Sequence, residues 1–229
     1  MSTITVLAFD LSTACVGVVA SVINKDTKEP ILVKSCPIIP KRFSPEELGY
    51  KKSKKRLPTS KSGEFLNTYY KDGETTISKS EKQRRDREVR TKENLFVLDY
   101  IGKQISTIIN AIRPDVIIVE KNEIFNGILT SVLLGKVMGV LIGIASSHSI
   151  PLKEFKVSKV RSIIDLNKAT RDLVESISEE ELKKVPDVTK RALRKLMEKK
   201  YGQYGLECKT DDESDACVVF NYWLESEFE

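Results

Sequence analysis

The sequence has little of what most catalytic and metal sites are built from. It holds a single histidine, His148, and its four cysteines are scattered with no C-x-x-C pair. These shortages disfavour a zinc site of the finger type and most acid–base schemes that depend on histidine. Any chemistry must therefore come from carboxylates, lysines or hydroxyls.

Long apolar runs are also scarce. No apolar leader opens the chain, because Asp10 interrupts the early apolar run, and the unpaired thiols are typical of a cytoplasmic protein. The apolar stretch 128–145 is barely long enough to cross a bilayer and carries Lys136 in its middle. We therefore expect a buried core helix there and no association with a membrane.

Charge is distributed unevenly along the 229 residues. The formal net charge is +5, yet residues 41–92 alone hold 16 Lys and Arg against 8 Asp and Glu. The rest of the chain is slightly acidic, with 22 basic against 25 acidic residues. Since 40% of the residues are hydrophobic, we expect a single domain over 1–229, with a basic insertion at about 41–92 and a polar one at 166–186.

Five segments are typical of strands. Short apolar runs at 6–9, about 17–23 and 31–39 are joined by polar turns and predict a β-meander. Residues 114–120 form a continuous apolar run, as in a central parallel strand that is buried on both faces, and 151–157 resembles a last strand. With helices between the later strands, the pattern predicts an α/β fold in which helices flank a mixed five-stranded sheet.

The remaining segments favour helices and loops. The basic segment 41–92 is charged and short of aliphatic residues, so we expect a flexible loop or extended arm after the third strand. Periodic apolar residues predict helices from about Lys92 to Pro114 and over 189–202 and 210–228. Thr210 and Glu213 have the spacing of a capping box at the start of the last helix.

Four carboxylates stand where they need an explanation. Asp10 and Glu120 each end an apolar strand, and an ionised carboxylate there is costly unless something compensates it. Asp212 and Asp215 share one face at the start of the last helix. Ordinary turn chemistry explains Asp10 taken singly, and simple helix-start acids explain residues 211–213. The joint arrangement is more specific, because ligands bind beyond the carboxyl ends of strands in open α/β sheets.

Such a set of acids suits a hard cation. Mg²⁺ and Mn²⁺ prefer oxygen ligands and keep several waters, so three or four carboxylates suffice for one or two ions. Two ions about 3.5–4 Å apart would clamp the attacking and leaving oxygens of a phosphodiester. The pattern therefore favours metal-dependent phosphodiester chemistry.

Three colinear blocks carry a family resemblance. The blocks AFDLSTACVGVV, DVIIVEKNEIFNGILTSVLLGKVMGVLIG and DDESDACVVF resemble Holliday junction resolvases of the RuvC type, which have the ribonuclease H-like fold. The resemblance implies an endonuclease that nicks four-way DNA junctions as a homodimer, with two Mg²⁺ ions, or Mn²⁺ in their place, in each active site. Its implied catalytic acids and metal ligands are Asp10, Glu120, Asp212 and Asp215.

The resemblance also implies basic and aromatic contacts. It assigns Lys190 a catalytic role, with the DNA-contacting Arg191 as a nearby substitute. It places Lys159 or Arg161 at a position that contacts a DNA phosphate, and Phe125 is the candidate aromatic that inserts at the junction. The basic insertion departs from the bacterial members, which suggests a phage or viral variant acting in the host cytoplasm. Its expected DNA contacts are Lys51, Lys52, Lys54, Lys55, Arg56, Arg84 and Arg85.

Other functions remain open. The strand-end Asp with Ser12 and Thr13 also resembles ATPases of the actin-like fold, including an accessory protein of tRNA modification, although the glycine-rich phosphate loops of those proteins are missing. A non-catalytic protein that binds branched DNA, a cutter of RNA–DNA hybrids and a transposase-like enzyme are further alternatives. Asp211 could replace Asp212 as a ligand, and Glu123 could replace Glu120.

Overall fold

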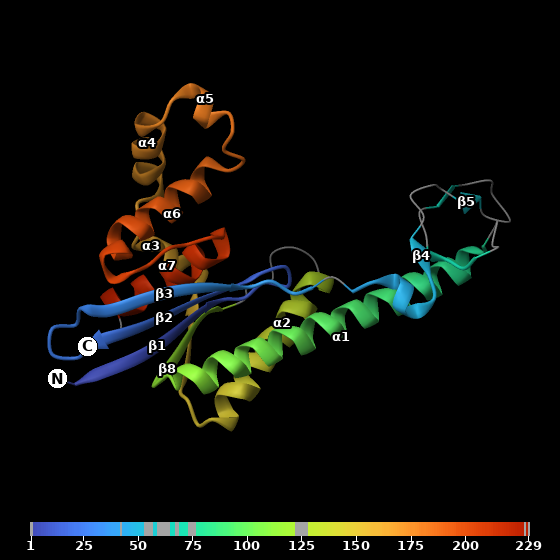
Figure 1. Cartoon of the computed structure of the whole chain (residues 1–229), viewed down its shortest axis with the longest axis horizontal. Coiled ribbons are helices and arrows are strands. Elements are labelled where there is room, and N and C mark those ends of the chain that lie inside the picture. The colour runs from blue at the N-terminus through green and yellow to red at the C-terminus, as the bar shows by residue number, and fades with distance from the viewer. Residues whose placement is uncertain are drawn as a thin grey trace. The chain divides into compact units, whose positions relative to one another are not determined.

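The computed structural model describes residues 2–41, 43–52, 57–58, 65–66, 69–72, 77–121, 128–226 and 228 (Figure 1). Contacts divide the chain into two compact units, the first formed by Met1–Pro40 with Ile101–Glu229 and the second by Lys41–Tyr100. The single-domain arrangement stays a prediction, and each unit is described by itself.

A five-stranded sheet in the order β3-β2-β1-β8-β9 forms the centre of the first unit (Figure 1). Its strands are β1 (Thr3–Asp10), β2 (Val16–Asn24), β3 (Pro30–Ile38), β8 (Val116–Lys121) and β9 (Leu152–Lys156). Strand β2 runs antiparallel to β1 and β3, whereas β8 is parallel to both β1 and β9. This mixed sheet, which helices flank, confirms the predicted α/β fold class.

Helices cover both faces of the sheet (Figure 1). In chain order, the helices of the described residues are α1 (Lys79–Ile112), α2 (Ile128–Ser147), α3 (Val157–Ser162), α4 (Leu166–Ser176), α5 (Glu179–Leu182), α6 (Val188–Tyr201) and α7 (Asp211–Ser226), with short 3-10 turns at Pro45–Leu48 and Gly202–Tyr204. Val6 and Ala8 of β1 share a buried cluster with residues of α7. Leu7 and Phe9, which point to the opposite face, are also fully buried. The central strand is therefore buried on both sides.

Helix α2 is buried along one side only, whereas the sequence predicts a buried core helix, and Val132 and Ile142 on it are exposed. It buries Val137, Leu141 and Ala145 along one side. The other helix on this side of the sheet, α1, lies close to it, since a Cβ placed on Gly102 of α1 would be 3.2 Å from the Val140 side chain. Among the described residues, no helix is long and apolar enough to span a membrane.

The second unit corrects one expectation. Helix α1 begins at Lys79, well before the predicted start near Lys92, so the charged run after residue 78 is helical and not part of a flexible arm. Opposite charges spaced one turn apart stabilise it, with Lys82 2.5 Å from Asp86 and Arg85 2.7 Å from Glu81. The high content of charged residues suggested a loop, whereas the spacing of opposite charges four residues apart favours a helix.

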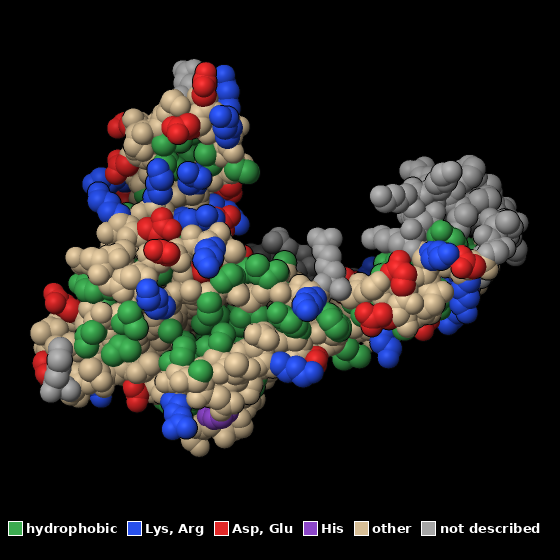
Figure 2. Space-filling view, in the orientation of Figure 1, with side chains coloured by type: hydrophobic (Ala, Val, Ile, Leu, Met, Phe, Trp, Pro, Cys, Tyr) green, Lys and Arg blue, Asp and Glu red, His purple; other side chains and the backbone are tan. Residues whose placement is uncertain are grey.

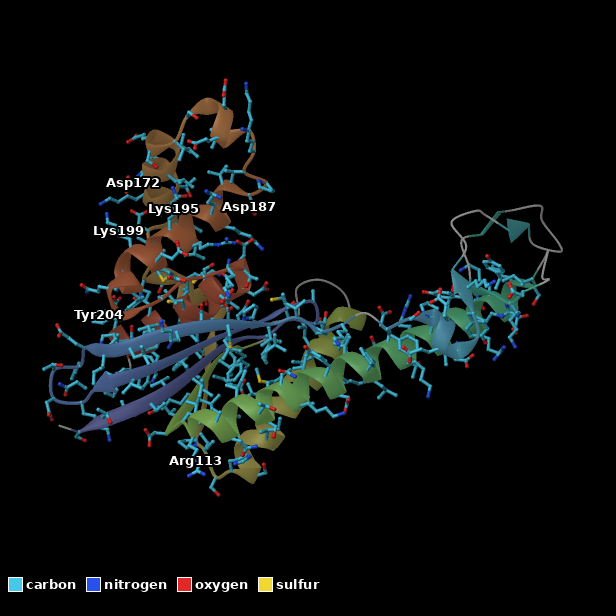
Figure 3. The ribbon with its side chains drawn as sticks, viewed as in Figure 1. Arg113, Asp172, Asp187, Lys195, Lys199 and Tyr204 are labelled. Atoms are coloured by element: carbon cyan, nitrogen blue, oxygen red, sulfur yellow. The ribbon has the colours of Figure 1, made fainter. Side chains whose placement is uncertain are left out.

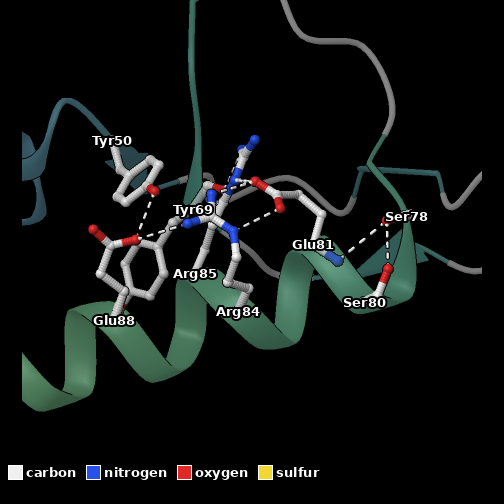
Figure 4. A network of polar contacts seen from close by, with 8 residues as sticks. All are labelled: Tyr50, Tyr69, Ser78, Ser80, Glu81, Arg84, Arg85 and Glu88. Carbon is white, nitrogen blue, oxygen red and sulfur yellow. Dashed lines mark hydrogen bonds and ion pairs between the residues drawn. The ribbon is translucent and has the colours of Figure 1, made fainter.

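A polar network lies at the start of this helix (Figure 4). The Arg85 guanidinium is buried, donates to the Tyr69 carbonyl at 3.1 Å and lies over the Tyr50 ring at 5.3 Å. The Tyr50 hydroxyl donates to Glu88 at 2.9 Å. The network joins α1 to β7 (Tyr69–Tyr70), which pairs with β4 (Lys51–Lys52). A second short pair is formed by β5 (Leu57–Pro58) with β6 (Phe65–Leu66).

The polar stretch 166–186 contains two helices, α4 and α5, and α4 packs along α6. Aspartates cap the two longer helices of this group. Asp165 accepts from the Lys168 amide at 2.9 Å and Asp187 from the Lys190 amide at 3.0 Å. The second insertion is therefore an ordered helical unit.

A capping box begins α7, as the sequence predicts, and its glutamate also accepts a hydrogen bond from the sheet. The Thr210 amide donates to Glu213 at 2.7 Å, and the Glu213 amide donates back to the Thr210 hydroxyl at 3.3 Å. Glu213 is fully buried, and its other carboxylate oxygen accepts from the Ser35 hydroxyl of β3 at 2.8 Å. One carboxylate thus fixes the first turn of α7 against the sheet.

We predict that Glu213→Ala lowers the free energy of unfolding by about 2–4 kcal/mol. The substitution removes a helix cap, takes the acceptor from the half-buried Thr210 amide and leaves a cavity where the buried Glu213 side chain was. Urea denaturation measures the effect. Glu207→Ala is the control, because this side chain is exposed and should change stability by less than about 0.5 kcal/mol. Equal stability of both variants would contradict the assignment.

Candidate active site

Two acids meet at the carboxyl ends of neighbouring parallel strands. Asp10 is the last residue of β1, and Glu120 stands one residue before the end of β8. The register pairs Phe9 with Val119, so the next residues on each strand are neighbours. Asp10 and Glu120 alternate in phase with Ala8 and Ile118, which face α7. Both carboxylates therefore point to the face that α7 covers.

A glycine brings α7 onto the sheet beside Asp10. Gly17 of β2 is paired with Asp10, and a Cβ at Gly17 would lie 1.9 Å from the carbonyl oxygen of Asp212. Only a residue without a side chain permits this approach of the helix backbone. Sequence reasoning did not single out Gly17, although a glycine inside a strand pattern is the signal that could have found it.

The acids interact strongly with one another. The pKa of Asp10 is raised from its ordinary value of 3.8 to about 8, first by burial and then by the negative charges of Asp215, Glu120 and Asp212. Burial also raises the pKa of Asp215. The structure thus brings together all four acids that the sequence pattern predicts.

Asp211 occupies a different position from Asp212. Its carboxylate accepts from Arg194 of α6 at 2.5 Å and lies 4.0 Å from the Lys190 ammonium. Asp212, not Asp211, is among the charges that raise the pKa of Asp10. This geometry favours Asp212 as the member of the cluster. Arg194 was missed in the sequence, where it is one of many basic residues of an amphipathic helix.

Two of the expected cations lie at the edge of the cluster. The Arg161 guanidinium of α3 is 3.9 Å from Asp215, and Arg161 and Lys190 both lower the pKa of that carboxyl against the effect of burial. Both side chains are more than half exposed. They are therefore accessible to an anion that approaches the acids from solvent.

Cys15 lies beside the acids. Its thiol is 4.0 Å from the Thr210 hydroxyl, and burial together with Asp212 raises the pKa of Cys15 to about 12. A thiol with so high a pKa stays protonated near neutral pH and is a poor nucleophile. The chemistry of this site therefore rests on the carboxylates.

The donor set fits Mg²⁺ in kind, since it consists of carboxylate oxygens whose charges repel one another without a cation. The carboxylates are farther apart than the ligands of a bound ion would be. In the described part of the chain, no three residues of the types His, Cys, Asp and Glu are grouped closely enough to hold a metal. Glu123, the alternative to Glu120, lies outside the described residues.

The other predicted DNA contacts that the structure describes are distributed over both units. Lys159 and Arg191 are exposed on α3 and α6. In the second unit, the Lys51 ammonium is 2.6 Å from Asp72 and Arg84 is exposed and 2.8 Å from Glu81, whereas the buried guanidinium of Arg85 is poorly placed to reach a phosphate. Positions outside the described residues are Lys54, Lys55, Arg56, Phe125 and the Lys52 side chain.

The chain is thus an α/β protein with acids at the ends of two neighbouring parallel strands and on the last helix. No known family model matches the sequence, and no curated protein matches it. The similar solved structures include two RuvC structures and a mitochondrial Holliday junction resolvase. RuvC of Thermus thermophilus in complex with Holliday junction substrate has a TM-score of 0.49 and 10% identity, over 98% of this chain and 97% of that one.

Two further structures are similar. A second Thermus thermophilus RuvC structure has a TM-score of 0.47 and 11% identity, over 96% of this chain and 95% of that one. The yeast mitochondrial Holliday junction resolvase Ydc2 has a TM-score of 0.41 and 12% identity, over 96% of this chain and 77% of that one. The predicted resemblance to RuvC is confirmed as a likeness of structure, while the fold class follows from the sheet itself.

We predict that Gly17→Ala lowers the free energy of unfolding by about 1–3 kcal/mol, because the added methyl group overlaps the Asp212 carbonyl and forces α7 to shift. Urea denaturation measures the loss. Gly202→Ala is the matched control, since Gly202 has helical backbone angles and open space around it. Gly17→Ala with the stability of wild type would mean that α7 does not rest on this residue.

Removal of the Asp10 charge should stabilise the metal-free protein at high pH. Because the pKa of Asp10 is higher in the folded state than in the unfolded chain, stability is lost as the pH rises from about 4 to about 8. In chelator at pH 9, Asp10→Asn should therefore be more stable than wild type by roughly 2–5 kcal/mol, with little difference at pH 4. Thermal unfolding across this pH range measures it. A constant difference between the two proteins would contradict the raised pKa.

Proposed function

We propose that this protein is a metal-dependent endonuclease that cuts phosphodiester bonds in branched DNA, with the four-way junction as its main substrate. Asp10, Glu120, Asp212 and Asp215 would hold two Mg²⁺ ions, or Mn²⁺ in their place. The observation that carries the proposal is the convergence of these four acids from β1, β8 and α7, where they raise the pKa of Asp10.

Mutual repulsion is the reason to favour a cation site over a purely structural one. A structural carboxylate is compensated by donors, as Glu213 is by Ser35, Lys209 and Thr210. Asp10 instead faces three other acids that raise its pKa, and the opposing effect of Arg161 is smaller than that of each acid. A bound divalent cation would replace the missing compensation. When bound, Mg²⁺ would polarise the phosphate and neutralise charge that builds on its oxygens.

The chain's own cations would orient the DNA. Lys190 and Arg161 stand at the exposed edge of the acids, where they would contact non-bridging oxygens of the phosphate that is cut. Arg194 would keep Asp211 turned toward α6 and so leave Asp212 to the metal. These residues bind and position the substrate, and the acids hold the ions.

A homodimer is part of the proposal, because a four-way junction presents two opposed strands to be nicked. Support comes from α2, whose glycines Gly135, Gly139 and Gly143 have open space around them, next to the exposed Val132 and Ile142. Such a smooth apolar strip permits a second copy to approach closely.

The alternatives have less support. An actin-like ATPase would need a glycine-rich phosphate loop, and the three glycines at 135, 139 and 143 lie inside α2. A protein that only binds branched DNA would have no use for four mutually repelling acids. RNA–DNA hybrids remain a candidate substrate, because the same acids would cut either backbone.

We predict that Asp10→Asn and Asp215→Asn each lower the rate of junction cleavage by at least about 100-fold, while the affinity for the junction stays within about threefold. The acids hold the ions, whereas Lys and Arg side chains supply most of the affinity. Nicking of a labelled synthetic four-way junction in Mg²⁺ and gel-shift binding in chelator measure the two quantities.

Asp26→Asn is the control for this pair, since Asp26 is exposed in the turn between β2 and β3 and should leave both cleavage and affinity unchanged. Cleavage by Asp10→Asn and Asp215→Asn at the rate of wild type would overturn the metal assignment. No nicking of the junction by wild type in Mg²⁺ or Mn²⁺ would overturn the proposed function itself.

A further inference from the structure

The basic residues of α6 fall into two groups. The helix contains six Lys and Arg and a single acid. Three of the basic side chains lie at acidic partners on α7, namely Lys190 and Arg194 at Asp211, and Lys200 at Glu225. The other three, Arg191, Lys195 and Lys199, are exposed and form no ion pair with any residue that the structure describes. The second group is therefore available to an anion from outside.

The two lysines of this second group line a cavity. Lys195 and Lys199 line a hollow of about 250 Å³ between α4 and α6, with Asp172 on the α4 side (Figure 3). The buried side chains of Leu173 and Ala192 also contribute to its lining. The hollow is apolar at its base and carries positive charge on the α6 side. Figure 2 shows Lys and Arg side chains over α4 and α6 on this face, with Asp and Glu side chains among them.

The row has a direction and a length. Residues 191, 195 and 199 are four apart, so they lie on one side of the helix at steps of about 6 Å. Lys190, next to the first of them, is 4.0 Å from Asp211. From Lys190 to Lys199 the helix rises about 13 Å, which corresponds to about four phosphates of one DNA strand at roughly 3.4 Å each along the axis.

We infer that Arg191, Lys195 and Lys199 form a track for the phosphate backbone of one DNA arm, which leads from the catalytic acids along α6. The inference rests on the proposed function, which supplies the DNA and its starting point. A small anion would need donors that converge on one point, whereas these three cations are strung along a line. A linear polyanion with regularly spaced charge fits such a row, and the apolar base of the hollow suits the sugars that lie between phosphates.

The α4 side of the hollow provides a second, independent test of the track. Asp172 faces the same hollow as Lys195 and Lys199, so its negative charge opposes a phosphate on α6. Loss of this carboxylate should strengthen DNA binding, whereas loss of the lysines should weaken it. A role of these residues in helix packing alone would not produce effects of opposite sign.

The test measures the affinity of a four-way junction for the full-length protein in chelator, as a function of salt. The double variant Lys195→Gln/Lys199→Gln should lower affinity roughly tenfold at low salt and reduce the slope of log affinity against log salt by about two. Asp172→Asn should raise affinity about twofold. The control Lys25→Gln/Lys200→Gln removes the same charge; Lys25 follows β2 at the far end of the sheet from Asp10, and Lys200 is paired with Glu225.

Neutral methylphosphonates locate the contact on the DNA. Replacement of phosphates two to four steps from the cleavage site, on one side of it, should weaken wild type and leave the affinity of Lys195→Gln/Lys199→Gln almost unchanged. Two results would overturn the track: equal affinity and slope of this variant and the control, or equal weakening of wild type and variant by the methylphosphonates. Wild-type protein without any affinity for the junction would instead remove the proposed function.

Discussion

The close approach of α7 to β2 at Gly17 is the constraint on which the site depends. The backbone of Asp212 occupies the space that any side chain at position 17 would fill, and the buried Glu213 fixes the same turn to β3. Because Gly17 is the strand partner of Asp10, this contact determines how near the helix acids come to the strand acids. The packing of α7 on the sheet therefore also determines how strongly the acids of the site repel one another.

Charge is ordered outward from this contact. The acids lie innermost, where burial and mutual repulsion raise the pKa of Asp10, and Arg161 and Lys190 lie at their exposed edge. Farther along α6, Lys195 and Lys199 extend the positively charged surface beyond the site. This order, with acids for a cation and bases for a phosphate backbone, is what a nuclease needs, and the net charge of +5 conceals it.

Much of this was predictable from the sequence, because strands and acids leave local signals. The apolar runs ending at Asp10 and Glu120, the capping box at Thr210 and the D-x-x-D of α7 are all readable from neighbouring residues. Gly17 and Arg194 were not, since their roles come from contacts with residues nearly 200 and 17 positions away. The helix that starts at Lys79 was hidden because composition, unlike the order of charges, does not distinguish a solvated helix from a loop.

The most direct test of the account is nicking of a synthetic four-way junction beside matched duplex, flap and RNA–DNA hybrid substrates, in Mg²⁺, in Mn²⁺ and in chelator. The account predicts paired nicks on opposed strands of the junction in either metal, slow cleavage of the other substrates, and no product in chelator. Cleavage that persists in chelator, or that is equally fast on plain duplex, would contradict it.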